Sequence, residues 1–248
     1  NSFPGAGVLP PLGWQTAGPA AGGVGLSVEE LRRDRAAYND LVLSKMRPQE
    51  YVEDIWKAVA EDQELGAVGP VVPLDDAHRA KVLLCRWLTV REEREKGWRT
   101  RCVDHETECG LNPATRVTER TANGSLFVLI SAILMFLGAG LNPLCWKRDI
   151  SKAFRRVPIR ASDHDLYWFA WLDAGKVWIA GHRGCPFGAV AAVQNWHRCA
   201  NLLQIAVLVL GGACVEKYVD DFFGCSRDDV LCCGGFLVTI LALSLIHI

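Results

Sequence analysis

The run SLFVLISAILMFLGAGL, residues 125–141, carries no charged side chain and is the most apolar stretch of the chain. A segment this apolar has to be covered by protein or by lipid, so it constrains the fold more than any other segment. It is shorter than the ~20 residues that span a bilayer, and Asn142-Pro143 follows two glycines at its end. Charged residues flank it without a clear aromatic belt. We therefore predict a buried helix here, with a membrane span as the alternative.

Composition favours a folded protein with a sizeable core. Half of the 248 residues are hydrophobic and the net charge is -1, so a nucleic-acid partner would have to be held by local basic clusters. The ten cysteines include no CxxC pair, which leaves zinc ribbons and thioredoxin motifs unsupported. Without a signal peptide, we expect reduced thiols in an intracellular protein that makes no stable membrane association.

The chain is expected to divide into four parts. Residues 1–26 are rich in Gly, Pro and Ala and predict a flexible leader. Residues 27–124 and 125–241 are expected to form two structural regions, and residues 242–248 a non-native tail.

Local patterns predict two helices and a hairpin in the first half. Ser27 and Glu30 form a capping box before one helix, and residues 47–63 place apolar side chains on one face of a second. Residues 81–90 and 97–104 are typical of two strands joined by a charged loop.

The second half alternates strands with one long helix. The pattern predicts a strand that ends near Asp149, a hairpin around Asp173-Ala174-Gly175, a long helix after Pro186-Phe187-Gly188, and a hairpin with Asp220 and Asp221 at its tip. This order indicates an α+β fold, with an antiparallel sheet and helices on one face.

Three motifs follow one another along the sequence: DISKAFRRVPI from Asp149, CPFGAVAAV from Cys185, and YVDD at residues 218–221. Each alone is weak, because a lone Asp, a Pro-Phe-Gly or an Asp pair is more often an ordinary turn. Together they resemble the palm of a reverse transcriptase. Residues 97–115, GWRTRCVDHETECGLNPAT, look like the end of the fingers in that family. The resemblance implies right-hand polymerase fingers at 27–124 and a palm at 125–241, with an antiparallel palm sheet packed on helices.

The resemblance also implies a two-metal nucleotidyltransferase. Asp149 and Asp220 would bridge two Mg²⁺ ions, with Mn²⁺ as a substitute, and Asp221 would be the third carboxylate. The carbonyl of Ile150 would complete the set. Hard cations prefer such oxygen ligands.

Further roles follow from the same resemblance. Phe154 would act as a steric gate that favours dNTP over rNTP. Arg101, preferred over Arg99, would bind the triphosphate, and Phe187 and Gly188 would line the nucleotide pocket.

Arg155 and Arg156 would contact phosphates of the RNA/DNA template-primer, although solvated surface is almost as good an interpretation. A thumb domain is not recognisable in the sequence, so an incomplete chain is expected. The alternatives are an RNA-dependent RNA polymerase, a non-catalytic domesticated relative and, least favoured, a membrane protein.

Overall fold

A computed structural model describes residues 2–10, 25–95, 97–118, 121, 123–211 and 214–227. The described chain is a mixed α+β protein, as the sequence predicts, and it falls into two compact units. Unit 1 contains residues 2–10, the described part of 25–118, and 154–195. Unit 2 contains the described parts of 121–153 and 196–227. Residues 154–195 therefore pack with the earlier segment, whereas the sequence analysis grouped them with 125–153.

Four helices follow β1 (Gly7–Val8) in the first part of unit 1. The predicted capping box is confirmed at α1 (Val28–Arg33), where Ser27 Oγ accepts from Glu30 N at 3.1 Å and Glu30 accepts from Ser27 N at 2.8 Å. The other helices are α2 (Arg35–Ser44), α3 (Val52–Glu64) and α4 (Asp76–Lys81). The helix predicted over residues 47–63 begins only at Val52, so Pro48 lies before α3.

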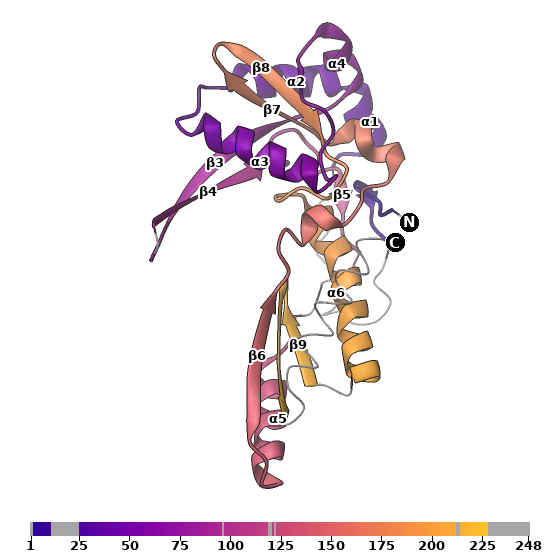
Figure 1. The fold of residues 1–248 in the computed structure, drawn as a ribbon. Coiled ribbons are helices and arrows are strands. Elements are labelled where there is room, and N and C mark those ends of the chain that lie inside the picture. The colour runs from indigo at the N-terminus through magenta and orange to yellow at the C-terminus, as the bar shows by residue number, and fades with distance from the viewer. Residues whose placement is uncertain are drawn as a thin grey trace. The chain divides into compact units, whose positions relative to one another are not determined.

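A five-stranded sheet forms the centre of unit 1, in the order β2-β8-β7-β3-β4. Its strands are β2 (Val72–Pro73), β3 (Leu84–Arg94), β4 (Gly97–Asp104), β7 (Trp168–Asp173) and β8 (Lys176–Gly181). All neighbours are antiparallel except β3 and β7. Helix α3 packs on this sheet through Ile55 and Val59, which join Trp87, Phe169 and Trp171 in the buried core (Figure 1). Both predicted hairpins of this region are confirmed.

Residues 2–10 are packed, contrary to the flexible leader predicted for 1–26. Strand β1 (Gly7–Val8) pairs with β5 (Thr115–Arg116), and Leu9 is fully buried. Gly5 N donates to Asp163 Oδ2 at 2.9 Å, and the Tyr167 hydroxyl donates to Gly5 O. A side chain at position 5 would overlap the Tyr167 ring, so glycine here serves close packing. Residues 11–24 and the predicted tail at 242–248 lie outside the described residues.

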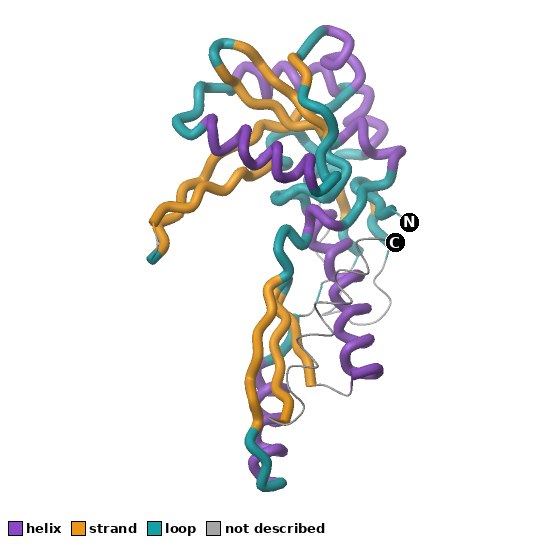
Figure 2. Tube along the Cα trace, in the orientation of Figure 1, coloured by secondary structure: helices purple, strands orange, loops and turns teal. Residues whose placement is uncertain are grey.

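Unit 2 is built on the antiparallel sheet β6-β10-β9 (Figure 2). Its strands are β6 (Pro143–Asp149), β9 (Cys214–Tyr218) and β10 (Asp221–Arg227). The long helix α6 (Val190–Gly211) follows the Pro-Phe-Gly turn as predicted. Two short 3-10 helices, Phe154–Arg156 and Ala161–Leu166, precede β7 and belong to unit 1. In unit 2 the helix buries a stripe at helical spacing: Trp196, Ala200, Leu203 and Val207.

The apolar run forms helix α5 (Leu126–Gly138), which contacts all three strands of this sheet. The helix is as predicted, but its burial is not: only Ala132 is buried, while Phe127 is 80% and Met135 74% exposed. A sheet of three strands covers one side of a helix and leaves the other apolar side chains of this helix exposed. Among the described residues, no helix has the length and apolarity needed to span a membrane.

A buried lysine lies next to the carboxylate turn of unit 2. Lys217 is 1% exposed, and its Nζ lies 3.0 Å from Nδ1 of His197 on α6. Burial lowers the pKa of Lys217 to about 8 and that of His197 to about 4. Both groups therefore bind protons more tightly in the unfolded chain.

We expect Lys217→Met to raise the free energy of unfolding at pH 7 by about 1 to 3 kcal/mol, because it removes a poorly solvated charge. In the parent, the lowered pKa makes stability rise with pH from about 8 to the unfolded value near 10.5. The variant should lose that slope. Urea unfolding at several pH values measures both effects, with the exposed Lys57→Met as control. If Lys217→Met is less stable than the parent at pH 7, then the buried ammonium does not destabilise the fold and the prediction is wrong.

Candidate active site

Strand pairing brings together the three carboxylates singled out in the sequence. Asp149 is the last residue of β6 and lies directly opposite Asp221, the first residue of β10. Asp220 precedes Asp221 in the turn, and its carbonyl accepts a hydrogen bond from Ile150 N at 3.1 Å. Asp149 is exposed, and Asp220 and Asp221 are half-buried. Residues far apart in the sequence thus form one acidic cluster at an accessible sheet end.

The turn that carries Asp220 is tight, and hydrogen bonds from residues outside the hairpin stabilise it. Tyr218 pairs with Asp221, so Val219 and Asp220 alone make the turn. Val219 has a φ of +55°, a left-handed conformation that β-branched residues rarely adopt. The Trp196 indole donates to Val219 O at 2.7 Å. This hydrogen bond and the one from Ile150 hold a strained turn in place.

Among the described residues, Asp149, Asp220 and Asp221 do not bring one oxygen each within 4.8 Å of the other two, and Asp221 pairs with a cation of the chain itself. Lys147 Nζ lies 2.8 Å from Asp221 Oδ2, so an ammonium group occupies part of the space where a metal ion would be bound. Asp221 raises the pKa of Lys147 through this hydrogen bond. The Lys147 side chain is 64% exposed and can move away at little cost. The donors are all oxygens, which suits Mg²⁺ better than softer metals.

Lys147→Ala is expected to tighten divalent-ion binding by up to about fivefold, because the competing ammonium is removed and an exposed ion pair is weak. Mn²⁺ titration followed by electron paramagnetic resonance measures the change. Arg148→Ala removes the neighbouring charge, on the opposite face of β6, and is the matched control. Equal effects of the two variants would mean that only net charge matters.

The predicted nucleotide-pocket residues meet in unit 1. The rings of Phe154 and Phe187 lie 6.2 Å apart between centroids, and Phe187 is 43% exposed. Gly188 has a φ of +122°, and a Cβ there would lie 2.2 Å from Asp104 O. Only glycine fits this close approach. The fold of unit 1 therefore brings Phe154 close to Phe187 and Gly188.

The Pro-Phe-Gly turn is tied to residues from the predicted fingers segment. Asp104 N donates to Phe187 O at 3.0 Å. Asn112 Nδ2 donates to Gly188 O at 2.9 Å, and its Oδ1 accepts from Val190 N at 2.9 Å, at the start of α6. Asp104 and Asn112 thus fix the turn, a role that their spacing in the sequence does not reveal.

Arg99 and Arg101 lie on one face of β4, because alternate residues of a strand share a face. Arg101 Nε lies 3.4 Å from Glu92 Oε2, and Glu92 pairs with Arg99 across the hairpin. Arg99 is exposed and Arg101 half-buried. Glu92 is next to both arginines, so these contacts do not show which guanidinium group would bind a triphosphate. The preference for Arg101 over Arg99 stays a prediction.

Arg155 lies in the core of unit 1, whereas the predicted contact with nucleic acid needs a side chain at the surface. Only 9% of its side chain is exposed, and it forms ion pairs with Asp62 at 3.1 Å and Asp104 at 3.2 Å. An adjacent basic pair after a turn gives no sign of which member faces inward. Arg156 is half-buried and stays a candidate.

His182 completes the buried network around Arg155. Its Nε2 lies 2.6 Å from Asp104 Oδ1, and its Nδ1 lies 2.8 Å from an Arg155 nitrogen. Burial lowers the pKa of His182. Burial alone would raise the pKa of Asp104, but the interactions with His182 and Arg155 lower it below its ordinary value. No sequence pattern pointed to His182 or Asp62. Both residues contact partners that are far away along the chain, so a local pattern cannot reveal these contacts.

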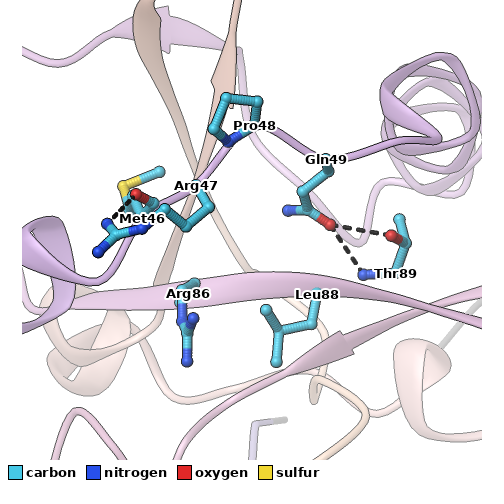
Figure 3. Close-up of a pocket in the computed structure, with 7 residues that line it drawn as sticks. All are labelled: Met46, Arg47, Pro48, Gln49, Arg86, Leu88 and Thr89. Atoms are coloured by element: carbon cyan, nitrogen blue, oxygen red, sulfur yellow. Dashed lines mark hydrogen bonds between the residues drawn. The ribbon is translucent and has the colours of Figure 1, made fainter.

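A shallow depression lies apart from these residues, between the loop before α3 and strand β3 (Figure 3). Gln49 crosses it, and its Oε1 accepts from Thr89 N at 2.9 Å and from Thr89 Oγ1 at 3.0 Å. Its volume of about 110 Å³ is well below the ~300 Å³ of typical ligand pockets, so it carries no functional assignment.

Comparison with known proteins gives no family assignment: the chain matches no protein-family model and no curated protein.

Proposed function

We propose that this chain is the nucleotidyl-transfer part of an RNA-directed DNA polymerase, with palm and fingers regions, and with dNTP and an RNA/DNA template-primer as its partners. The observation that carries the proposal is the strand pairing that sets Asp149 opposite Asp221, with Asp220 in the adjoining turn. The order of the DISKAF, CPFG and YVDD motifs along the sequence supports the same function.

The carboxylates would hold two Mg²⁺ ions, which when bound activate a primer 3′-hydroxyl and stabilise the leaving pyrophosphate oxygens. In this proposal Asp149 and Asp220 would hold both ions, and Asp221 would be the third carboxylate, toward the primer end. The Ile150 carbonyl adds a neutral oxygen. Lys147 would have to release Asp221 for that carboxylate to hold an ion.

The residues of unit 1 select the nucleotide in this proposal. The Phe154 ring would clash with a ribose 2′-hydroxyl and so favour dNTP. Its contact with Phe187 fixes the ring by packing. Arg101 or Arg99 would neutralise the triphosphate, since charge-assisted contacts to phosphate are strong. Arg156 would contact template-primer phosphate.

Primer extension by the full-length protein on an RNA template, with dNTPs and rNTPs in parallel reactions and Mg²⁺ present, tests the function. The proposal expects DNA synthesis and much weaker use of rNTPs. Efficient use of rNTPs with Phe154 intact would favour an RNA-synthesising enzyme. Tight template-primer binding without any extension would favour a non-catalytic relative.

A further inference from the structure

Two cysteines and a glutamate meet in the core of unit 1. One donor atom from each of Cys85, Glu106 and Cys109 lies within 4.8 Å of the other two. The three residues are 1%, 1% and 0% exposed. They belong to neither the carboxylate cluster nor the phenylalanine pair, and the proposed polymerase reaction makes no use of them.

The fold explains why these residues meet. In the β3–β4 pair Trp87 lies opposite Asp104, and His105 N still donates to Arg86 O at 3.1 Å beyond the end of β4. Continuing this antiparallel register by two residues sets Glu106 opposite Cys85. The chain then turns, and the Glu106 carbonyl accepts from Asn112 N at 3.1 Å. This turn brings Cys109 back to Glu106, with Sγ 3.4 Å from Oε2.

The cluster leaves one buried polar atom without a partner. Glu106 Oε1 has no hydrogen-bond partner among the residues that the structure describes, although the side chain is fully buried. An orphaned carboxylate oxygen costs about 1 to 3 kcal/mol or more. Two thiols are weak donors and cannot compensate it well. A cation would satisfy both Glu106 oxygens at once.

We propose that Cys85, Glu106 and Cys109 form a structural zinc site. Two thiolates select a soft or borderline metal such as Zn²⁺ over Mg²⁺. In a tetrahedral site with Zn–S distances near 2.3 Å, two sulfurs lie roughly 3.8 Å apart, so a modest contraction of the observed cluster closes around the ion. The two Glu106 oxygens, together with the two sulfurs, supply four donor atoms.

The position of the site decides its role. Because all three ligands are buried, a substrate in solution has no access to the ion, which favours a structural role over a catalytic one. It would join the start of β3 to the segment that ends in Asn112, and so support the Pro-Phe-Gly turn that Asn112 holds. Binding releases the ligand protons to solvent and is coupled to folding.

The test is metal analysis of the full chain, purified from zinc-containing medium and refolded with and without Zn²⁺. We expect about one zinc per chain and a higher melting temperature in the refolded zinc sample. Cys85→Ser and Glu106→Gln should each lose zinc and the zinc-dependent shift. Cys102→Ser alters a partly buried thiol of β4 outside the cluster and should keep both.

A second measurement protects the test against variants that fail to fold. The parent refolded with Co²⁺ should show a sulfur-to-cobalt charge-transfer absorption in the near ultraviolet, since thiolates are its ligands. Absence of this absorption in a folded parent, or zinc content unchanged in a folded Cys85→Ser, would overturn the proposal. A Cys85–Cys109 disulfide in protein purified with zinc and without oxidant would do so as well.

Discussion

Asp220→Asn is expected to reduce primer extension by at least about a hundredfold, the largest effect on activity that we predict for any single substitution. Loss of a residue that merely supports a metal ligand already costs 10- to 100-fold, and Asp220 is itself a proposed bridging ligand. Asparagine keeps the size of the side chain and removes its charge. The Ile150–Asp220 hydrogen bond uses the backbone carbonyl, so the turn should survive.

Two measurements distinguish a lost metal from a lost fold. Primer extension in Mg²⁺ gives the rate, and Mn²⁺ binding followed by electron paramagnetic resonance gives the number of bound ions, which should fall in the variant. Asp76→Asn makes the same chemical change at an exposed position of α4 and should leave both unchanged. Extension by Asp220→Asn at the parent rate would sink the metal assignment.

Sequence patterns predicted the local elements that carry the candidate site. The hairpin with Asp220 and Asp221 at its tip follows from two apolar strands around a short polar turn, which is a local signal. Its pairing with the strand that ends at Asp149 joins segments far apart in the chain, and no local pattern encodes it. The resemblance to a family implied only that Asp149 lies close to Asp220. The structure pairs Asp149 with Asp221.

Burial was harder to predict than secondary structure. Helix α5 has the composition of a core helix, yet a three-stranded sheet covers little of it. Leu9 lies in a stretch with the composition of a linker, yet it is fully buried because β1 pairs with β5. Composition reports what a segment could bury, whereas tertiary pairing decides what it does bury.

The same reason hid the zinc-site candidate. Cys85 and Cys109 do not follow a short-spacing metal motif, and only the β3–β4 register brings them together with Glu106. Motif searches detect ligands that are close in sequence. Here one ligand lies on β3 and the other two follow the end of β4, so the strand register has to be known first. The charged loop predicted after residue 90 in fact extends β3 to Arg94.

Arg155→Met is expected to lower the free energy of unfolding by about 3 to 5 kcal/mol, because it leaves two buried carboxylates without their shared guanidinium. Asp62 and Asp104 are 4% and 2% exposed, so water cannot replace the lost ion pairs. Methionine keeps most of the apolar volume, which separates the charge effect from a cavity. Urea unfolding measures the loss.

The control for this prediction is Arg160→Met, which breaks an ion pair with Asp163 from a side chain that is 52% exposed and should cost below about 1 kcal/mol. Adding Asp62→Asn and Asp104→Asn to Arg155→Met should recover part of the lost stability, since the unpaired charges are then gone. If Arg155→Met instead keeps full stability and weakens binding to a template-primer duplex, Arg155 contacts nucleic acid and the buried network is not what holds unit 1 together. Stability and binding thus separate an arginine that holds the core from one that contacts phosphate.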